Sequence, residues 1–326
     1  MIVTRTPFRI TLGGGGTDIP SYYQHDGGLV ATMAIDQYVY ITLKPDSFEK
    51  LCKLRYSEIE IVSDLQDLKN VRAREALLMH SLKEVEINSC ADLSCRSGLG
   101  SSGSFLVGLL KAIREYKQLD NSPATIAEEA CTIEIDKLGE PVGKQDQYIA
   151  AFGGIRVLEI TKDGVVDVHG LNIDHQSLIQ NMHVYSLNIQ RNASEVLSDQ
   201  QKMGNLHDGK TKQTLDVIKE FGHRSIELLL RSDFDKYGLL LDEYWREKKK
   251  LSPKVSVRIV DKIYETVKLA YGVLGGKIIG AGGGGFLLLY TNQRHNELEK
   301  YMKTVGLQRL RYTVSHTGST VLGNFL

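Results

Sequence analysis

The feature that most constrains this chain is a pair of glycine-rich runs that lie far apart in the sequence. Residues 98–104 read Gly-Leu-Gly-Ser-Ser-Gly-Ser, and residues 280–286 read Gly-Ala-Gly-Gly-Gly-Gly-Phe. Because glycine carries no side chain, the backbone N–H groups of both runs can approach an anion closely. The first run also stands where a helix is expected to begin, and the N-terminus of a helix favours negative charge. The two runs therefore predict a chain that binds phosphate.

Charge and composition narrow the class of ligand. Lys plus Arg and Asp plus Glu both number 40, so no global field would attract nucleic acid or an anionic membrane. A small molecule is the expected partner.

The amino terminus lacks the pattern of a signal peptide and no apolar run is long enough to cross a membrane, which favours a cytoplasmic protein. The cysteines form no CxxC pair and the histidines no HExxH motif, so no zinc site is indicated.

A length of 326 residues predicts two domains, with a boundary near residues 170–185. Hydrophobic patterning predicts a mixed first half and helices over most of residues 193–271, followed by further strands. The expected elements of the first half are strands at 2–12, 30–43, 51–61 and 86–95, helices at 20–24, 72–83, 105–113 and 123–138, and a hairpin at 153–168. Those of the second half are strands at 183–189, 276–280, 286–290, 310–314 and 319–325 and a helix at 293–305.

Local signals fix several of these ends. Ser122 followed by a proline is an expected N-cap, and Ser101 or Ser102 is the expected cap of the helix after the first glycine run. Thr17 or Asp18 is expected to cap the short helix at residues 20–24.

Residues 98–103 also match GxGxxG, the fingerprint of dinucleotide sites. The later context differs, because no second strand ending in an acidic residue follows. The serine hydroxyls of the run favour a triphosphate with a metal ion. A tight turn without a ligand is the alternative. For the glycines at 282–285, a nucleotide and another loop are equally good reasons for a bare backbone.

Three acidic residues and one arginine stand out. On the helix at 123–138, Glu134 shares a face with apolar residues and should point inward, where it must be paired, hydrogen-bonded or bound to metal. Asp146 follows in a polar loop, where it can accept a proton from a hydroxyl or be a surface acid. Asp18 can bind ligand hydroxyls or cap a helix. Arg9 lies on the expected first strand. If it has no function, its charge should be solvated or paired with an acid.

Taken together, three ordered motifs resemble the GHMP kinases. The motifs are Pro-Phe-Arg at 7–9 with Gly-Gly-Gly-Gly-Thr-Asp at 13–18, Ser-Gly-Leu-Gly-Ser-Ser-Gly-Ser at 97–104, and the glycine run at 280–286. The resemblance implies an ATP-dependent kinase with an α+β fold. It implies a domain like domain 2 of ribosomal protein S5 at residues 1–175 and a ferredoxin-like domain at residues 176–326.

The resemblance also implies roles for single residues. It makes Asp146 the catalytic aspartate with Arg9 nearby, and Ser102, or else Ser101, the magnesium partner of Glu134. We hypothesise that Lys144 and Arg9 stabilise the transferred phosphoryl group. The ATP phosphates are assigned to Ser97, Gly98, Leu99, Gly100, Ser101, Ser102, Gly103, Ser104, Gly282, Gly283 and Gly284, and the substrate to Gly15, Gly16, Thr17, Asp18 and Gly143.

Within the family, the chain is most similar to kinases of D-glycero-D-manno-heptose 7-phosphate. The likeness includes Asn-Ala-Ser at 192–194 and Tyr-Trp at 244–245 with Lys248 downstream. It implies phosphorylation of the anomeric hydroxyl to give the 1,7-bisphosphate. Bacterial kinases of fucose and other free sugars share much of the pattern. Arg72, Arg74 and Lys144 are candidate cations for a substrate phosphate, with a solvated helix face as the alternative for the two arginines.

Two rival functions come from other classes. A catalytically inactive sugar or nucleotide sensor could keep the fold, although the intact Glu134 and Asp146 argue against it. A dinucleotide-dependent oxidoreductase is the other. The sequence leaves the acceptor, its anomer and the oligomeric state open, and a homodimer is compatible with it.

Overall fold

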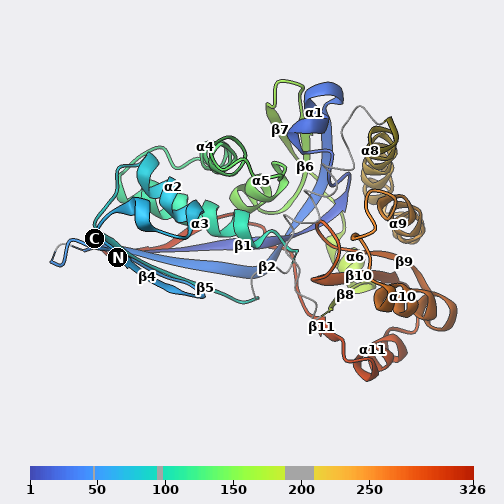
Figure 1. Cartoon of the computed structure of the whole chain (residues 1–326). Coiled ribbons are helices and arrows are strands. Elements are labelled where there is room, and N and C mark those ends of the chain that lie inside the picture. Colours follow the sequence, from blue (N-terminus) through green and yellow to red (C-terminus); the bar gives the residue numbers. More distant parts are fainter. Residues whose placement is uncertain (47, 94–97, 188–208) are drawn as a thin grey trace.

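Two sheets, one in each half of the molecule, organise the chain (Figure 1). The computed structural model describes residues 1–46, 48–93, 98–187 and 209–326. The first sheet has the order β12-β1-β2-β5-β3-β4, with β6 paired to β2 and β7 to β6. Its strands are β1 (Ile2–Gly13), β2 (Gly28–Pro45), β3 (Cys52–Arg55), β4 (Ile59–Val62), β5 (Val85–Ala91), β6 (Ile155–Ile160), β7 (Val166–Gly170) and β12 (Thr320–Asn324).

Helices cover one face of this sheet (Figure 1). They are α2 (Val71–Met79), α3 (Ser101–Tyr116), α4 (Pro123–Cys131) and α5 (Gln145–Phe152), while α1 (Pro20–Asp26) lies beside β6 and β7. The apolar face of α3 is fully buried, with Leu106, Leu109, Leu110 and Ile113 inaccessible to solvent. This burial fixes α3, and the turn before it, against β1.

The second sheet has the order β11-β8-β10-β9, and every pair in it is antiparallel. Its strands are β8 (Met182–Ser186), β9 (Val273–Ile278), β10 (Phe286–Thr291) and β11 (Gln308–Leu310), and its helices are α6 (His175–Asn181), α8 (Gly209–Leu230), α9 (Phe234–Lys248), α10 (Arg258–Tyr271) and α11 (His295–Thr304). From β8 through helices to β9, then β10, α11 and β11, the chain follows the βαββαβ order of a ferredoxin-like fold. The α+β fold expected from the sequence is confirmed.

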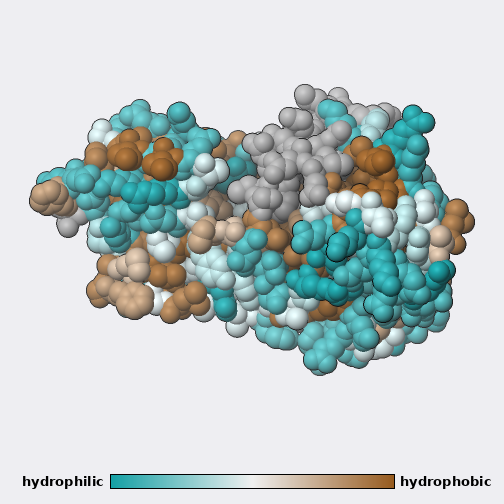
Figure 2. Space-filling view, turned by 90° about the horizontal axis from the view of Figure 1, so that it is seen from below, coloured by the Kyte–Doolittle hydropathy of each residue, from teal (hydrophilic) through white to brown (hydrophobic). Residues whose placement is uncertain are grey.

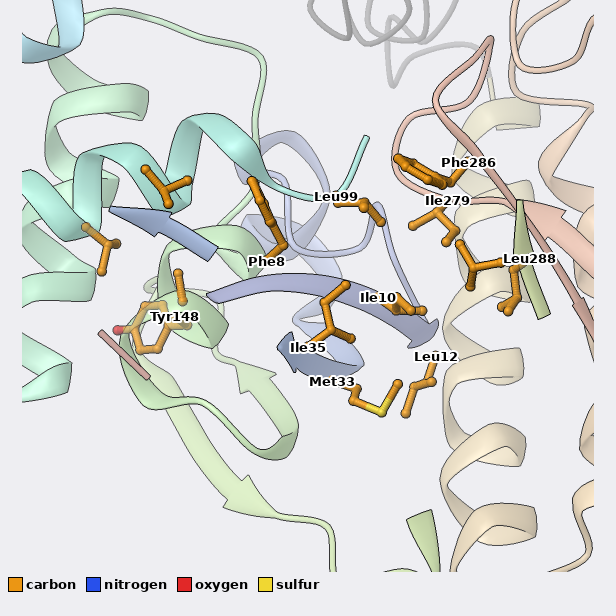
Figure 3. Close-up of a cluster of buried hydrophobic side chains, with 14 of the residues drawn as sticks. Phe8, Ile10, Leu12, Met33, Ile35, Leu99, Tyr148, Ile279, Phe286 and Leu288 are labelled. Atoms are coloured by element: carbon orange, nitrogen blue, oxygen red, sulfur yellow. The ribbon is translucent and has the colours of Figure 1, made fainter. Parts of the chain in front are cut away.

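The two halves share one apolar core. Figure 3 shows Ile10 and Leu12 of β1 in one apolar cluster with Leu99, Ile279 and Phe286. Leu99 and Ile279 lie in the loops that carry the glycine runs, and Phe286 is the first residue of β10. The chain also returns to its start, because β12 pairs with β1 and both termini lie at the same end of the molecule (Figure 1). The division into residues 1–175 and 176–326 therefore stays a proposal, with the final strand added to the first sheet.

Most predicted elements are present, and several ends differ. The Ser122 cap is confirmed, since its side chain accepts a hydrogen bond from the N–H of Thr125. The hairpin is confirmed as β6 and β7, paired antiparallel. The expected strand at 51–61 is two short antiparallel strands, β3 and β4. The helix expected at 123–138 is α-helical to Cys131 and continues as a π-helical turn, Thr132–Lys137.

Two predicted caps are wrong. Gly100, with a φ of 82°, precedes α3, so neither Ser101 nor Ser102 is its N-cap. Ile19 precedes α1, and no side chain caps that helix. The helices expected across 193–271 are seen as α8, α9 and α10 from residue 209 onward, and the earlier part lies outside the described residues.

The surface in Figure 2 is mixed, with apolar patches separated by hydrophilic side chains. In the described part of the chain, no helix combines the length and the apolar character that crossing a membrane needs.

Candidate active site

A pocket of about 180 Å³ lies where the two halves of the molecule meet. One wall comes from β1, the turn after it, and the starts of α3 and α5. The other wall comes from α8, the end of α9, and β9 with the turn that follows it. The pocket is therefore lined by segments from both halves of the chain, and residues of both glycine-rich runs are among them.

Arg9 and Asp146 form the centre of the first wall. The Arg9 Nε donates to Asp146 Oδ1 at 2.8 Å, and Nη2 donates to Oδ2 at 3.1 Å. The Arg9 Nη1 donates to the carbonyl of Gly98 at 2.6 Å, and the Gln145 side-chain amide donates to Asp146 Oδ1 at 3.2 Å. Such a two-point pair fixes the plane of the carboxylate. Asp146 was expected in a loop, but it lies in the first turn of α5, which holds it more rigidly.

Asp18 lies on the same wall and also lines the pocket. Its carboxylate accepts hydrogen bonds from the backbone N–H groups of Gly16 and Gln145, each at 3.0 Å. Burial raises the pKa of Asp18, against these two hydrogen bonds, and the charge of Asp146 raises it further. A Cβ on Gly143 would come within 2.0 Å of Asp18 Oδ2, so only glycine fits there.

The run at 98–104 divides between pocket and core. Gly98, Gly100, Ser101 and Ser102 line the pocket. Leu99 is buried in the apolar core. A Cβ on Gly103 would come within 2.9 Å of Asp146 Cβ. The Ser104 hydroxyl donates to the carbonyl of Pro7 at 2.8 Å, so it faces β1 and not the pocket. Ser97 lies outside the described residues, as do residues 192–194.

The second glycine run meets the pocket at its start. Gly280 and Ala281 line the pocket, whereas Gly282, Gly283 and Gly284 are not among its lining residues. A Cβ on Gly280 would lie 2.5 Å from the carbonyl oxygen of Gly98, so the two runs touch. Gly282 and Gly283 instead approach Val255, whose carbonyl accepts a 2.8 Å hydrogen bond from the N–H of Gly283. Contact with the neighbouring loop is thus one reason for the bare backbone at Gly282 and Gly283, and the assignment of Gly282, Gly283 and Gly284 to the ATP phosphates stays a prediction.

Two lysines of the second wall were not among the predicted site residues. Lys248 ends α9 and Lys277 lies in β9, and both line the pocket while almost fully buried. The Lys248 ammonium donates to the carbonyl of Gly280. Burial, with a smaller effect of Arg9, lowers the pKa of Lys248 to about 8. Burial also lowers the pKa of Lys277 well below its usual value, and Lys248 and Arg9 lower it further.

Glu134 is buried as predicted, with no exposed surface, but it does not line the pocket. Its carboxylate accepts from Arg72 Nε at 2.6 Å and from the Gln147 side chain at 2.5 Å. Burial raises the pKa of Glu134, and the charge of Arg72 opposes that rise. The structure therefore shows the ion pair that was one of the predicted alternatives. Glu134 lies in the π-helical turn, a distortion that often marks functional positions.

Several predicted cations and one predicted substrate residue point elsewhere. The Lys144 ammonium binds the carboxylate of Glu128 at 2.9 Å and the carbonyl of Gly164 at 2.6 Å, so this geometry does not support its predicted role at the phosphates. Arg74 contacts Glu75. The Thr17 hydroxyl lies 2.8 Å from the carbonyl oxygen of Gly14 and 2.9 Å from that of Leu29, which fixes the turn instead of facing the pocket.

The pocket fits a ligand that carries phosphate. Gly98 and Gly100 have φ values of 76° and 82°, and a Cβ there would approach Ile279 and Asp146 closely. Lys277 Nζ has no hydrogen-bond partner within the described ranges. For magnesium, Ser102 lines the pocket, and Glu134 lies behind it with two donors already bound. Among the described side chains, no group of three or more His, Cys, Asp or Glu residues is arranged to bind a metal. Magnesium usually takes only one or two carboxylates beside substrate phosphates.

The structure thus brings together ten of the predicted site residues and adds others. The ten are Arg9, Gly15, Gly16, Asp18, Gly98, Gly100, Ser101, Ser102, Gly143 and Asp146. The added residues include Thr11, Gln145, Tyr244, Lys248 and Lys277. Helical spacing could have found Lys248, because it shares the buried face of α9 with Leu241 and Tyr244. Lys277 is the only charged residue in the apolar strand β9, and this pattern could also have marked it as a candidate site residue.

Comparison with known families gives two matches. Residues 67–154 match the model described as GHMP kinases N terminal domain. Residues 225–306 match the model described as GHMP kinases C terminal.

Individual proteins agree with these matches. The chain is 31% identical over 322 residues to the D-glycero-alpha-D-manno-heptose 7-phosphate kinase of Campylobacter jejuni, covering 94% of both chains. It is 28% identical to the L-fucokinase/L-fucose-1-P guanylyltransferase of Bacteroides fragilis, across 87% of this chain but 34% of that protein. The solved structure of a D-glycero-D-manno-heptose 1-phosphate kinase from Bacteroides thetaiotaomicron superimposes with a TM-score of 0.80 at 22% identity, covering all of both chains.

Proposed function

The chain belongs to the GHMP kinase family and is a sugar kinase, and from this premise we propose that it phosphorylates the anomeric hydroxyl of a sugar phosphate. ATP is the phosphate donor of this family. The proposed acceptor is D-glycero-D-manno-heptose 7-phosphate, and the product is the 1,7-bisphosphate. The similarity to the Campylobacter jejuni enzyme along nearly the whole chain supports this acceptor.

One observation carries the proposed chemistry. The Asp146 carboxylate accepts hydrogen bonds from Nε and Nη2 of Arg9, and both residues line the pocket where α3 begins. A hydroxyl bound beside Asp146 can pass its proton to a carboxylate oxygen while its own oxygen attacks the terminal phosphorus of ATP. The bond from that phosphorus to the bridging oxygen breaks, and ADP leaves. In phosphoryl transfer most of the catalysis comes from such positioning and from charge stabilisation.

The acceptor is proposed to lie between Asp146 and Asp18. Asp18 is fixed by two backbone N–H groups, and it leaves acceptor capacity for sugar hydroxyls. Gly15, Gly16 and Gly143 line the same part of the pocket, and the lack of a side chain at Gly143 lets Asp18 pack directly against its backbone. Thr17 supports this region through the backbone instead of touching the sugar.

Magnesium remains part of the proposal, with Ser102 and Glu134 as its protein ligands. When bound, the ion would neutralise charge on the ATP phosphates. The two carboxylate oxygens of Glu134 accept hydrogen bonds from Arg72 and Gln147, so one of these bonds would have to break before Glu134 could bind the ion. A requirement for magnesium in the assay is the expected outcome.

The experiment is a panel of acceptors offered with ATP and magnesium, scored by ADP formation. The panel contains D-glycero-D-manno-heptose 7-phosphate, the free heptose, L-fucose, mannose and galactose. We expect the heptose 7-phosphate to have the highest kcat/KM, and product analysis to place the new phosphate at C1. A higher kcat/KM for fucose or another free sugar would replace the acceptor with a free sugar. No ADP from any acceptor would favour an inactive sensor.

A further inference from the structure

The second wall of the pocket carries two buried ammonium groups that the proposed chemistry has not used. Lys248 is 7% exposed and Lys277 is 1% exposed, and both line the pocket with Arg9. The two lysines come from α9 and from β9, elements that pack on one another in the second half of the molecule. This placement needs explaining, because burying an uncompensated charge is costly.

Neither lysine has an acidic partner in the described part of the chain. Lys248 donates to one carbonyl, that of Gly280, and Lys277 Nζ has no hydrogen-bond partner there. The Nζ of Lys277 lies over the ring of Tyr244, 4.3 Å from its centroid. The two acids of the pocket are already engaged, Asp146 by Arg9 and Asp18 by backbone N–H groups.

A purely structural role explains this arrangement poorly. The attraction between a cation and an aromatic ring offsets only part of the free energy that is lost when an ion is buried. Methionine would pack on Tyr244 as well without that cost. Burial lowers the pKa of both lysines, which means that their surroundings disfavour the charged form. A bound anion would supply the missing charge.

The contacts of Lys248 indicate where such an anion would bind. Lys248 binds the carbonyl of Gly280, and Gly280 touches Gly98, the first described residue of the phosphate-binding run. Arg9 binds the carbonyl of Gly98 and also holds Asp146. Lys248 therefore lies beside the start of α3, and Lys277 lines the same pocket close enough to Lys248 and Arg9 for their charges to lower its pKa. The proposed transfer from ATP to the hydroxyl beside Asp146 would take place next to these groups.

We propose that Lys248 and Lys277 form a phosphate subsite that receives the terminal phosphoryl group of ATP. The proposal rests on the proposed function and deepens it. The two lysines take the role that the sequence had suggested for Lys144. As the bond to ADP breaks and the bond to the sugar oxygen forms, negative charge on the equatorial oxygens stays beside the two ammonium groups. A phosphate on the acceptor has the same chemistry and is the competing source.

Binding measurements without any acceptor test the subsite. Isothermal titration calorimetry compares ADP with the non-hydrolysable ATP analogue AMPPNP, for the wild type, Lys277→Met and Lys248→Met. We expect each variant to bind AMPPNP about 10- to 100-fold more weakly while its ADP affinity is little changed, as loss of a charge-assisted hydrogen bond predicts. Lys250→Met is the control, because this lysine is exposed and pairs with Glu247.

Two further measurements separate a binding role from a folding defect. Lys277→Met should raise the melting temperature of the unliganded protein, since it removes an unpaired buried charge. Lys277→Arg, which keeps the charge, should retain part of the preference for AMPPNP over ADP. A lower melting temperature in Lys277→Met together with equal weakening of ADP and AMPPNP would show a structural lysine and overturn the proposal.

A last arm distinguishes the two phosphate sources. Binding of heptose 7-phosphate and of free heptose is measured with the same variants. A loss confined to the phosphorylated sugar, with AMPPNP unaffected, would assign the lysines to the acceptor and overturn their assignment to ATP. Unchanged binding of every ligand would reject a phosphate subsite altogether. Because the AMPPNP and ADP arms need no turnover, the subsite stands or falls independently of the acceptor proposed above.

Discussion

The two walls of the pocket are built on opposite principles. On the first wall, Arg9, Asp146, Gln145 and Asp18 satisfy one another through hydrogen bonds of 2.8 to 3.2 Å. On the second wall, Lys248 and Lys277 are as deeply buried but have no acidic partner in the described part of the chain. The polar groups of the first wall are paired with one another without a ligand. The two lysines of the second wall would gain a negative partner only when an anion binds.

This difference shows how the site divides its work. A base and its orienting arginine must be in place before the substrate arrives, since preorganised groups need no rearrangement during reaction. Cations for a transferred phosphate gain from being left unpaired, because an internal acid would compete with the ligand. The unpaired lysines of the second wall thus lower the folding stability while they favour binding of phosphate. The substitutions below compare the two walls directly.

The largest effect is expected from Asp146→Asn on the first wall. Asparagine keeps an oxygen for Arg9 but cannot accept the proton, so kcat should fall about 10²- to 10⁴-fold. AMPPNP affinity, measured by calorimetry, should stay close to that of the wild type. Asp163→Asn, in the exposed turn of the hairpin, is the control. Near-normal turnover in Asp146→Asn would remove this residue from the proposed chemistry.

The next largest effect concerns the buried pair behind the first wall. Arg72→Met leaves the Glu134 carboxylate buried without its cation and should lower the free energy of unfolding by about 3 to 5 kcal/mol. Urea denaturation measures this loss. Arg74→Met, on the same helix but paired with Glu75 at 3.4 Å, should change stability far less.

The same pair tests the magnesium assignment. Glu134→Gln should raise the magnesium concentration needed for half-maximal activity if this carboxylate binds the ion. A loss of stability with an unchanged magnesium requirement would leave Glu134 as a structural partner of Arg72 alone.

A smaller effect is expected where the two walls touch. Gly280→Ala places a methyl group 2.5 Å from the Gly98 carbonyl at a φ of 76°, so it should both strain the backbone and separate the glycine runs. The strain alone is about 1 to 2 kcal/mol. Gly306→Ala is the matched control, with a φ of 79° and nothing near the added Cβ. AMPPNP binding should weaken in the first variant only, and equal binding in both would argue against contact between the walls.

The smallest effect is a pH dependence of the second wall. Lys248 has a pKa of about 8 in the folded protein, below its usual 10.5, so the unfolded chain binds more protons between these values. This group therefore makes the unliganded protein more stable as pH rises from 8 to 10.5. Anion binding needs the ammonium form, so AMPPNP affinity should fall about threefold from pH 7.5 to 8.5. Calorimetry at both pH values checks this, and Lys248→Met should lose that threefold fall.

The sequence predicted the frame of the site well because its signals are local or strongly patterned. The glycine runs, the Ser122 cap and the hairpin depend on residues within a few positions of one another. The inward face of Glu134 followed from helical spacing. The same logic did not decide between an ion pair and a metal ligand, because Arg72 lies on another helix far away in the chain.

Three polar residues next to a motif do not point into the pocket. Ser104 and Thr17 were assigned to ligands through the family motifs, and Lys144 through the hypothesis for phosphoryl transfer. Each of the three side chains binds a protein carbonyl instead. In a turn or at the start of a helix, one residue can face the pocket while the next faces the core. Proximity in sequence therefore did not give the direction of the side chain.

The sequence by itself determined the kinase family, and it located the two glycine-rich runs and the acidic residues of the proposed site. Only the tertiary structure decided which of these face one pocket, and it alone brought Lys248 and Lys277 opposite Asp146. The physical reason is that charges act through space. The value of a lysine depends on which acids, carbonyls and rings surround it, and those neighbours come from strands and helices that only folding brings together.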